Sequence, residues 1–127
     1  VFIGAAGEGE NASATRADYA AAAARVISED GHAGITYELA GDAGWTLSQL
    51  AAELAKQSGK KVVYQNLSEA DFAAALKGVG LPAGLADMLA DSDTGASKGG
   101  LFDDSHTLSK LIGRPTTSLA DSVKGIV

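Results

Sequence analysis

The chain has 127 residues and a mass of 12.7 kDa, and 46% of its residues are apolar. Its 16 acidic and 10 basic side chains give a formal charge of -6, which argues against nucleic acid or an anionic membrane surface as a partner. With no cysteine and two histidines, the chain cannot form disulfides, thiolate nucleophiles or His-rich metal cages. It has no apolar run near the roughly 20 residues of a membrane span and no basic and apolar leader. We therefore expect one cytoplasmic domain over residues 1–127.

The first third of the chain predicts a strand, a turn and a helix. Residues 1–5 are apolar and short, which favours a strand, and the Gly- and Asn-rich residues 7–11 predict a turn. Residues 12–14 are compatible with a second hairpin arm. A helix is expected to begin at Thr15, whose hydroxyl can accept an amide of the first turn. It is expected to end at residues 29–31, where Gly31 suits a left-handed cap.

The middle third alternates strands and helices. Residues 35–40 alternate apolar and polar types and predict a strand, and residues 62–66 predict another. Between them, Thr46 and Gln49 form a capping box that opens a helix closed by Gly59. Such alternation is typical of α/β crossovers.

The last third is expected to be mainly helical, with helices over residues 68–80, 82–90, 108–112 and 117–126. In the second of these, Leu85, Met88 and Leu89 share one face, so we expect that face to be buried. Residues 91–100 are polar and Gly-rich, which favours an exposed loop. The predicted class is therefore α/β, with a few short strands and about six helices.

No motif supplies a complete catalytic apparatus. Gly4, Gly7 and Gly9 have the reverse of the dinucleotide-fingerprint spacing and no helix directly after them, so a turn is the preferred interpretation. Residues 95–99 match G-x-S-x-G without the strand that a nucleophile elbow requires. In residues 103–106, neighbouring Asp, Ser and His side chains cannot converge as a triad, and Asp103 or Asp104 is expected to cap the next helix.

Three further patterns concern single residues or pairs. Asp91 and Asp93 have the wrong register for a calcium loop, so no metal site is predicted. Arg16 either pairs with Asp18 or faces an anionic ligand, and the ion pair is the preferred interpretation. None of the three tyrosines is followed four residues later by lysine, so the Tyr-x-x-x-Lys pair of classical short-chain dehydrogenases is absent.

Several longer strings resemble a known family over the whole chain. Residues 15–20 (TRADYA), 37–41 (YELAG) and 45–47 (WTL) resemble the C-terminal part of NmrA-like, atypical short-chain dehydrogenases. The strings YQNLSEADF (64–72) and LIGRPTT (111–117), together with GASKGGLF, resemble bacterial NAD(P)H:quinone oxidoreductase of the second type.

This resemblance implies a Rossmann-type NmrA-like fold whose N-terminal, dinucleotide-binding half is missing from the chain. In the family, that half makes most contacts to NADPH, and the C-terminal part helps to line the quinone pocket. The family reduces quinones without a bound flavin. We therefore expect residues 1–127 to be an acceptor-side domain or fragment that does not bind NADPH alone. Its expected partners are a quinone and the missing half. A second copy of the chain is also an expected partner, because an apolar face is exposed where that half is missing.

The resemblance also places residues 1–5 beside the cleft between the two halves, where ligands bind. The candidate substrate-binding residues are Phe2, Ile3, Gly7, Arg16 and Phe102, with the two aromatic rings offering flat apolar faces to a quinone. A core position for both rings is an equally good interpretation. No residue is assigned a catalytic role.

Two other functions remain open. NmrA-like proteins include regulators that sense a dinucleotide without turning it over, and a freestanding, oligomeric interaction domain is a further alternative. The strings between residues 64 and 102 favour the enzyme.

Overall fold

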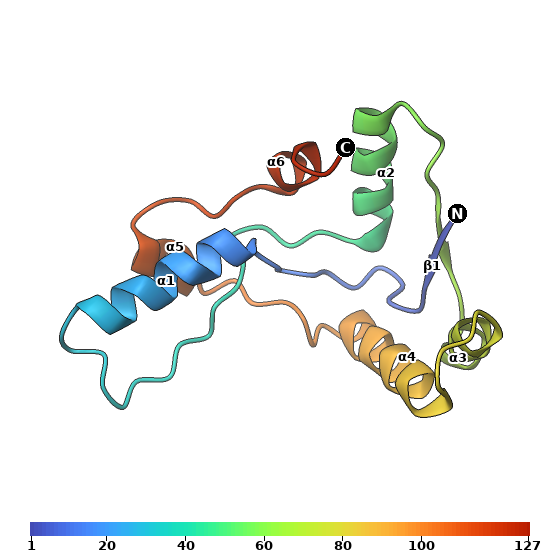
Figure 1. Ribbon diagram of the computed structural model, residues 1–127, viewed down its shortest axis with the longest axis horizontal. Helices are drawn as coiled ribbons and strands as arrows, with labels where there is room; N and C mark the ends of the chain where they lie inside the picture. The colour runs from blue at the N-terminus through green and yellow to red at the C-terminus, as the bar shows by residue number, and fades with distance from the viewer.

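The computed structural model describes residues 1–127 and has the mixed α/β class that the sequence predicts (Figure 1). Strand β1 (Phe2–Gly4) pairs in parallel with β2 (Tyr64–Asn66), and Phe2 lies opposite Tyr64. The six helices are α1 (Arg16–Ser28), α2 (Leu47–Ser58), α3 (Glu69–Gly78), α4 (Ala83–Ser97), α5 (Thr107–Ile112) and α6 (Leu119–Lys124). None of these helices is both long and apolar enough to cross a bilayer.

Local capping signals set the starts of four helices. The hydroxyls of Thr15, Thr46, Ser68 and Ser118 each accept the amide three residues on. Thr46 and Gln49 form the complete predicted capping box, and α2 ends at Gly59 in the left-handed conformation. These boundaries are confirmed because capping depends on residues within one turn of each other.

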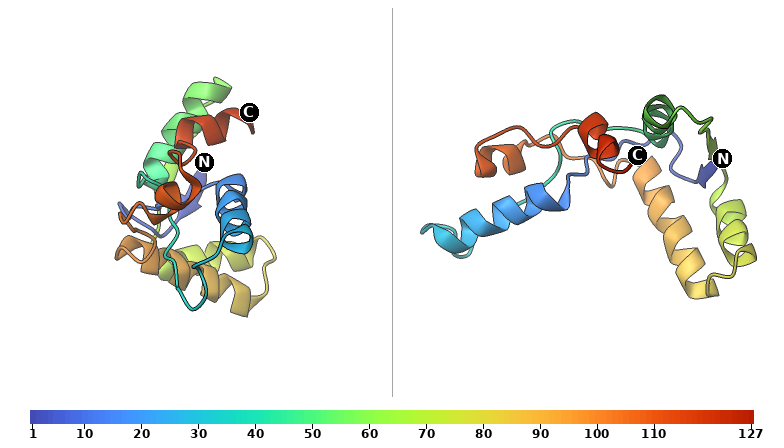
Figure 2. Two further views of the ribbon diagram at one scale, coloured as in Figure 1. Left: turned by 90° about the vertical axis from the view of Figure 1, so that its left-hand side faces the viewer. Right: turned by 45° about the horizontal axis from the view of Figure 1, so that its top comes forward.

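The elements are spread along an elongated molecule, with the α3–α4 hairpin at one end and α1 at the other (Figure 2). A small apolar core joins β1 to that hairpin, and its members are Ala5, Phe72, Ala73 and Ala90, with Ile3, Leu67 and Leu76 packed against them. Helix α2 contacts β2 and packs against α6.

The surface is large for the mass of the chain. The accessible area is 7671 Å², whereas a compact monomer of this mass exposes about 6,200 Å². Several large apolar side chains are therefore exposed, among them Ile27, Met88 and Val79. The excess of about 1,500 Å² exceeds the roughly 800 Å² that one partner contributes to a standard interface.

The predicted burial of Leu85, Met88 and Leu89 is wrong, since the exposed fraction of Met88 is 58% and those of the two leucines also exceed one third. Helix α4 instead packs on α3 through its small residues Ala86 and Ala90, which are fully buried. The narrow alanine face brings the two helix backbones close together and leaves the larger apolar face without a partner.

The strand predicted at residues 35–40 is absent. Between residues 36 and 40, no backbone amide or carbonyl has a backbone partner. A strand forms only when its backbone groups pair with a neighbour, and no neighbouring strand is present. Residues 12–14 likewise form no hairpin arm, because Asn11 makes an isolated antiparallel bridge with Trp45 and Ala12 donates to the Leu101 carbonyl.

Two other predictions are also wrong. The loop expected at residues 91–100 is mostly helix, since α4 continues to Ser97 and buries Ala96. The predicted end of α1 is confirmed, since the helix stops at Ser28 with Glu29 as its C-cap and Gly31 has φ 93°. Neither Asp103 nor Asp104 caps α5. His106 occupies that position with φ 56° and no side-chain cap.

Candidate functional site

The carboxyl ends of β1 and β2 meet beside a turn that carries Gly7. The Gly7 amide donates to Asn66 Oδ1 over 2.8 Å, and the Tyr64 hydroxyl donates to the same oxygen over 3.0 Å. Gly7 has φ +53°, a conformation that favours glycine. Carboxyl ends of parallel strands are common ligand sites in open α/β sheets, so this edge is a candidate functional site.

Two aromatic residues begin the same two strands, and the hydroxyl of one of them, Tyr64, reaches Asn66 at the carboxyl ends. The Phe2 and Tyr64 ring centroids lie 5.5 Å apart with a tilt of 56°. Burial raises the pKa of Tyr64, and the carboxylates of Asp93 and Glu8 raise it further, while hydrogen bonding with the Ala6 and Gly7 backbone opposes the rise. The phenol therefore stays protonated at neutral pH and keeps its hydrogen to donate.

Helix α4 holds this turn in place. Asp93 Oδ2 accepts the Ala5 amide over 2.8 Å. A Cβ at Gly9 would collide with the Ala96 carbonyl, so only glycine permits the close approach of the two backbones. The expected loop 91–100 thus contains a helical carboxylate that fixes the residues after β1.

The five candidate substrate-binding residues fall into separate groups. Phe2 and Gly7 lie together around Tyr64 and Asn66, and Ile3 packs against the apolar core. Arg16 is exposed on the first turn of α1 and makes no ion pair.

Phe102 lies elsewhere, in a cavity of about 280 Å³ that also contains Asn11 and Leu101. Its side chain is 44% exposed, and its ring lies so close to Gly44 that a Cβ there would be 3.0 Å from it. The Asn11 amide nitrogen is buried without a partner. Neither aromatic candidate is a fully buried core residue.

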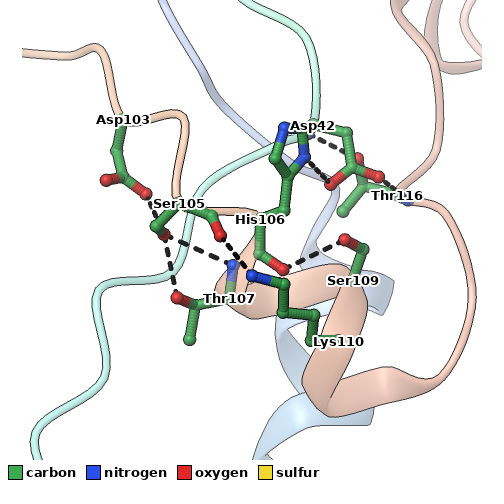
Figure 3. A network of polar contacts seen from close by, with 8 residues as sticks. All are labelled: Asp42, Asp103, Ser105, His106, Thr107, Ser109, Lys110 and Thr116. Atoms are coloured by element: carbon green, nitrogen blue, oxygen red, sulfur yellow. Dashed lines mark hydrogen bonds and ion pairs between the residues drawn. The ribbon is translucent and has the colours of Figure 1, made fainter.

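A polar network surrounds Asp42 (Figure 3). Asp42 Oδ1 lies 2.9 Å from His106 Nδ1, and its Oδ2 accepts the Thr116 amide over 3.0 Å. Burial raises the pKa of Asp42, but hydrogen bonds from Ser109, Thr116 and His106 outweigh it and lower the pKa to about 2. The carboxylate is therefore an acceptor only, so His106 Nδ1 carries the proton of this bond. Next to it, the Ser105 hydroxyl donates to Asp103.

Asp18 is a fully buried carboxylate, and the predicted ion pair between it and Arg16 is wrong. Its Oδ2 accepts the Thr117 amide over 2.8 Å, and its Oδ1 lies 2.7 Å from Arg114 Nη1. Burial raises the pKa of Asp18, whereas bonds from Thr117, Arg114 and Thr15 lower it, and the net direction is downward.

No cluster of three or more ionisable side chains in this chain could hold a metal ion. The Gly-rich turn between β1 and α1 leads into irregular backbone, and α1 begins only at Arg16. No helix N-terminus therefore stands directly behind these glycines to receive a pyrophosphate.

Comparisons with known proteins agree with this architecture. No protein-family model matches the chain. Quinone oxidoreductase 2 of Escherichia coli is 84% identical over 123 residues, which cover 97% of this chain and 43% of the relative. The crystal structure of that enzyme with NADPH matches with a TM-score of 0.95 at 82% identity, over 98% of this chain and 44% of the other.

The chain is related to the C-terminal portion of NmrA-like quinone oxidoreductases of the second type. Citrobacter sp. triphenylmethane reductase complexed with NADP(H) is a further structural neighbour, with a TM-score of 0.91 and 38% identity over 99% of this chain and 44% of that one. The NAD(P)H azoreductase of Xenophilus azovorans is 28% identical over 93% of this chain and 41% of the relative. The chain thus spans less than half the length of the relatives that it matches.

Sequence reasoning did not assign Tyr64, Asn66 or Asp93 to this site. Asn66 could have been found, because it ends a predicted strand at the edge where α/β proteins bind ligands. Asp93 could not, because its partner Ala5 lies 88 residues away in the sequence.

Proposed function

We propose that residues 1–127 form the acceptor-side portion of an NAD(P)H-dependent quinone oxidoreductase and act only together with a dinucleotide-binding portion. The observation that carries this proposal is the 84% identity to Escherichia coli quinone oxidoreductase 2 across nearly the whole chain. At this identity, side chains and backbone are expected to serve the same role in both proteins.

The other relatives support a class of acceptor. Their names describe reduction of quinones, azo compounds and triphenylmethane dyes, which are all conjugated molecules with planar rings that accept a hydride or electrons. Phe2 and Phe102 present rings to solvent or a cavity, and such faces suit flat apolar ligands. Ile3, Gly7 and Arg16 complete the proposed set. The Tyr64 phenol would donate to an acceptor oxygen in place of its present hydrogen bond to Asn66 Oδ1.

Two structural features of the chain support the need for a dinucleotide-binding portion. The surface excess of about 1,500 Å² is the size of a domain interface, and residues 36–40 make no backbone-to-backbone hydrogen bond. A partner sheet that paired with this segment would turn it into the predicted strand.

A chimera tests the proposal. The 127 residues replace the matching stretch of Escherichia coli quinone oxidoreductase 2, and NADPH oxidation is followed with menadione as acceptor. We expect the chimera to turn over and the 127-residue chain alone neither to bind nor to oxidise NADPH. Turnover by the chain alone would refute the proposal, and a chimera that binds NADPH without oxidising it would favour the sensing role.

Two matched variants of the chimera test the acceptor site. Phe2→Ala should raise the KM for menadione about three- to tenfold, which corresponds to the free energy of one aromatic contact. The KM for NADPH should stay unchanged. Asp30→Ala, at an exposed side chain beyond the end of α1 that makes no hydrogen bond or ion pair, is the control and should change neither constant. An unchanged KM for menadione in Phe2→Ala would remove Phe2 from the acceptor site.

A further inference from the structure

A cavity of about 490 Å³ lies outside the proposed acceptor site. Three segments distant in the sequence enclose it, residues 13–15, 41–45 and 115–119, and Gln49 and Ser122 complete its walls. Its volume falls within the roughly 300–1,000 Å³ of typical small-molecule sites.

The walls of this cavity are held rigidly. Asp42 and Thr116 bind each other twice, since the Asp42 amide donates to Thr116 Oγ1 over 2.8 Å and the Thr116 amide donates back to the carboxylate. Asp18 accepts the next amide, that of Thr117, and the Gly41 amide donates to the Ala12 carbonyl. A ligand would therefore meet a preformed surface and lose little affinity to ordering it.

The charges in the cavity disfavour an anion. No lysine, arginine or histidine lines it, and its single charged lining residue is Asp42. Three helices begin at its edge, but their first-turn amides are already bound by the hydroxyls of Thr15, Thr46 and Ser118. Those helix ends consequently have fewer free donors for a phosphate or carboxylate.

The lining suits a neutral ligand rich in hydroxyl groups. Trp45 supplies a half-buried indole ring, whose apolar face fits the C–H face of a sugar ring. Ser13 and the Gln49 amide nitrogen make no hydrogen bond within the chain and can bind ligand oxygens, while the Asp42 carboxylate accepts from ligand hydroxyls.

We propose that this cavity binds a neutral, polyhydroxylated small molecule of mono- or disaccharide size, with its ring on Trp45 and its hydroxyls on Ser13, Gln49 and Asp42. The site is independent of the proposed quinone reduction. All of its lining residues belong to this chain, so the chain itself can be used to test it.

The single tryptophan of the chain provides the test. The 127-residue chain is titrated with D-glucose, N-acetyl-D-glucosamine and sucrose while Trp45 fluorescence is recorded, and amide shifts of Gly41 and Thr117 are followed by NMR. We expect saturable changes in both signals with at least one of these sugars.

Matched variants locate the binding. Ala43 is exposed and lines the cavity, so Ala43→Phe should fill its mouth and abolish the changes. Ala33→Phe, at an exposed alanine outside the cavity, should leave them intact. Ser13→Ala should weaken binding by about two- to twelvefold, the range for one hydrogen bond.

Three outcomes would overturn the proposal. The first is the absence of a saturable shift with any of the three sugars. The second is equal binding by the Ala43→Phe and Ala33→Phe variants. The third is tighter binding of inorganic phosphate than of every sugar, which would identify an anion site instead.

Discussion

Replacing Asp18 with alanine should destabilise the chain substantially. The carboxylate is fully buried and accepts the Thr117 amide, so the substitution leaves that amide without its charged partner. A hydrogen bond to a charged group contributes about 1.5–3 kcal/mol. The ion pair with Arg114 adds less than about 1 kcal/mol, because the guanidinium side chain is 48% exposed.

Together these terms predict a loss of about 2–4 kcal/mol in the free energy of unfolding at neutral pH. The sign of the pH dependence follows from the lowered pKa of Asp18. The ionised carboxylate stabilises the fold fully above its unfolded pKa, and that contribution disappears as the pH falls through the lower folded value. The difference between Asp18→Ala and the unsubstituted chain should therefore shrink in acid.

Urea denaturation followed by far-ultraviolet circular dichroism measures the effect. Asp91→Ala is the matched control, since Asp91 is exposed on α4 and makes no hydrogen bond or ion pair. Arg114→Gln should cost under about 1 kcal/mol. A loss in Asp18→Ala no larger than that in Asp91→Ala would show that the buried carboxylate does not hold residues 114–118 in place.

Two further predictions concern α4 and the Asp42 network. Gly9→Ala should lower the free energy of unfolding by about 1–3 kcal/mol, because its Cβ would collide with the Ala96 carbonyl. Gly95→Ala, with open space at its Cβ, should raise it by up to about 1 kcal/mol, and equal effects would contradict the packing. Because the folded pKa of Asp42 is about 2, its contribution to stability should persist above about pH 4 and disappear toward pH 2. Asp42→Asn should flatten acid denaturation in that window, and an unchanged acid transition would contradict the assignment.

The helices were largely predictable because their signals are local. Thr46 and Gln49 lie within one turn, and so do Ser68 and its amide partner. The strand at residues 35–40 was mispredicted because alternation records a preference for pairing but cannot supply the neighbouring strand. The helical end of α4 was missed because it depends on Asp93 and Ala96 packing against residues at the other end of the chain.

The candidate site was predicted in part for the same reason. Phe2 and Gly7 were singled out through the resemblance, and the structure places them around Tyr64 and Asn66. That grouping depends on the pairing of β1 with β2, about sixty positions apart. Their assignment to acceptor binding stays a prediction for the chimera to test.

The carboxylates of Asp18 and Asp42 bind successive amides of the same short stretch, at Thr117 and Thr116. That stretch leads directly into α6. Unfolding that spread from the C-terminus past Thr117 would therefore expose both carboxylates. Fraying from the C-terminus should consequently stop before Thr117, and the amides of residues 116 and 117 should exchange with solvent deuterium together with those of α1 as one cooperative unit.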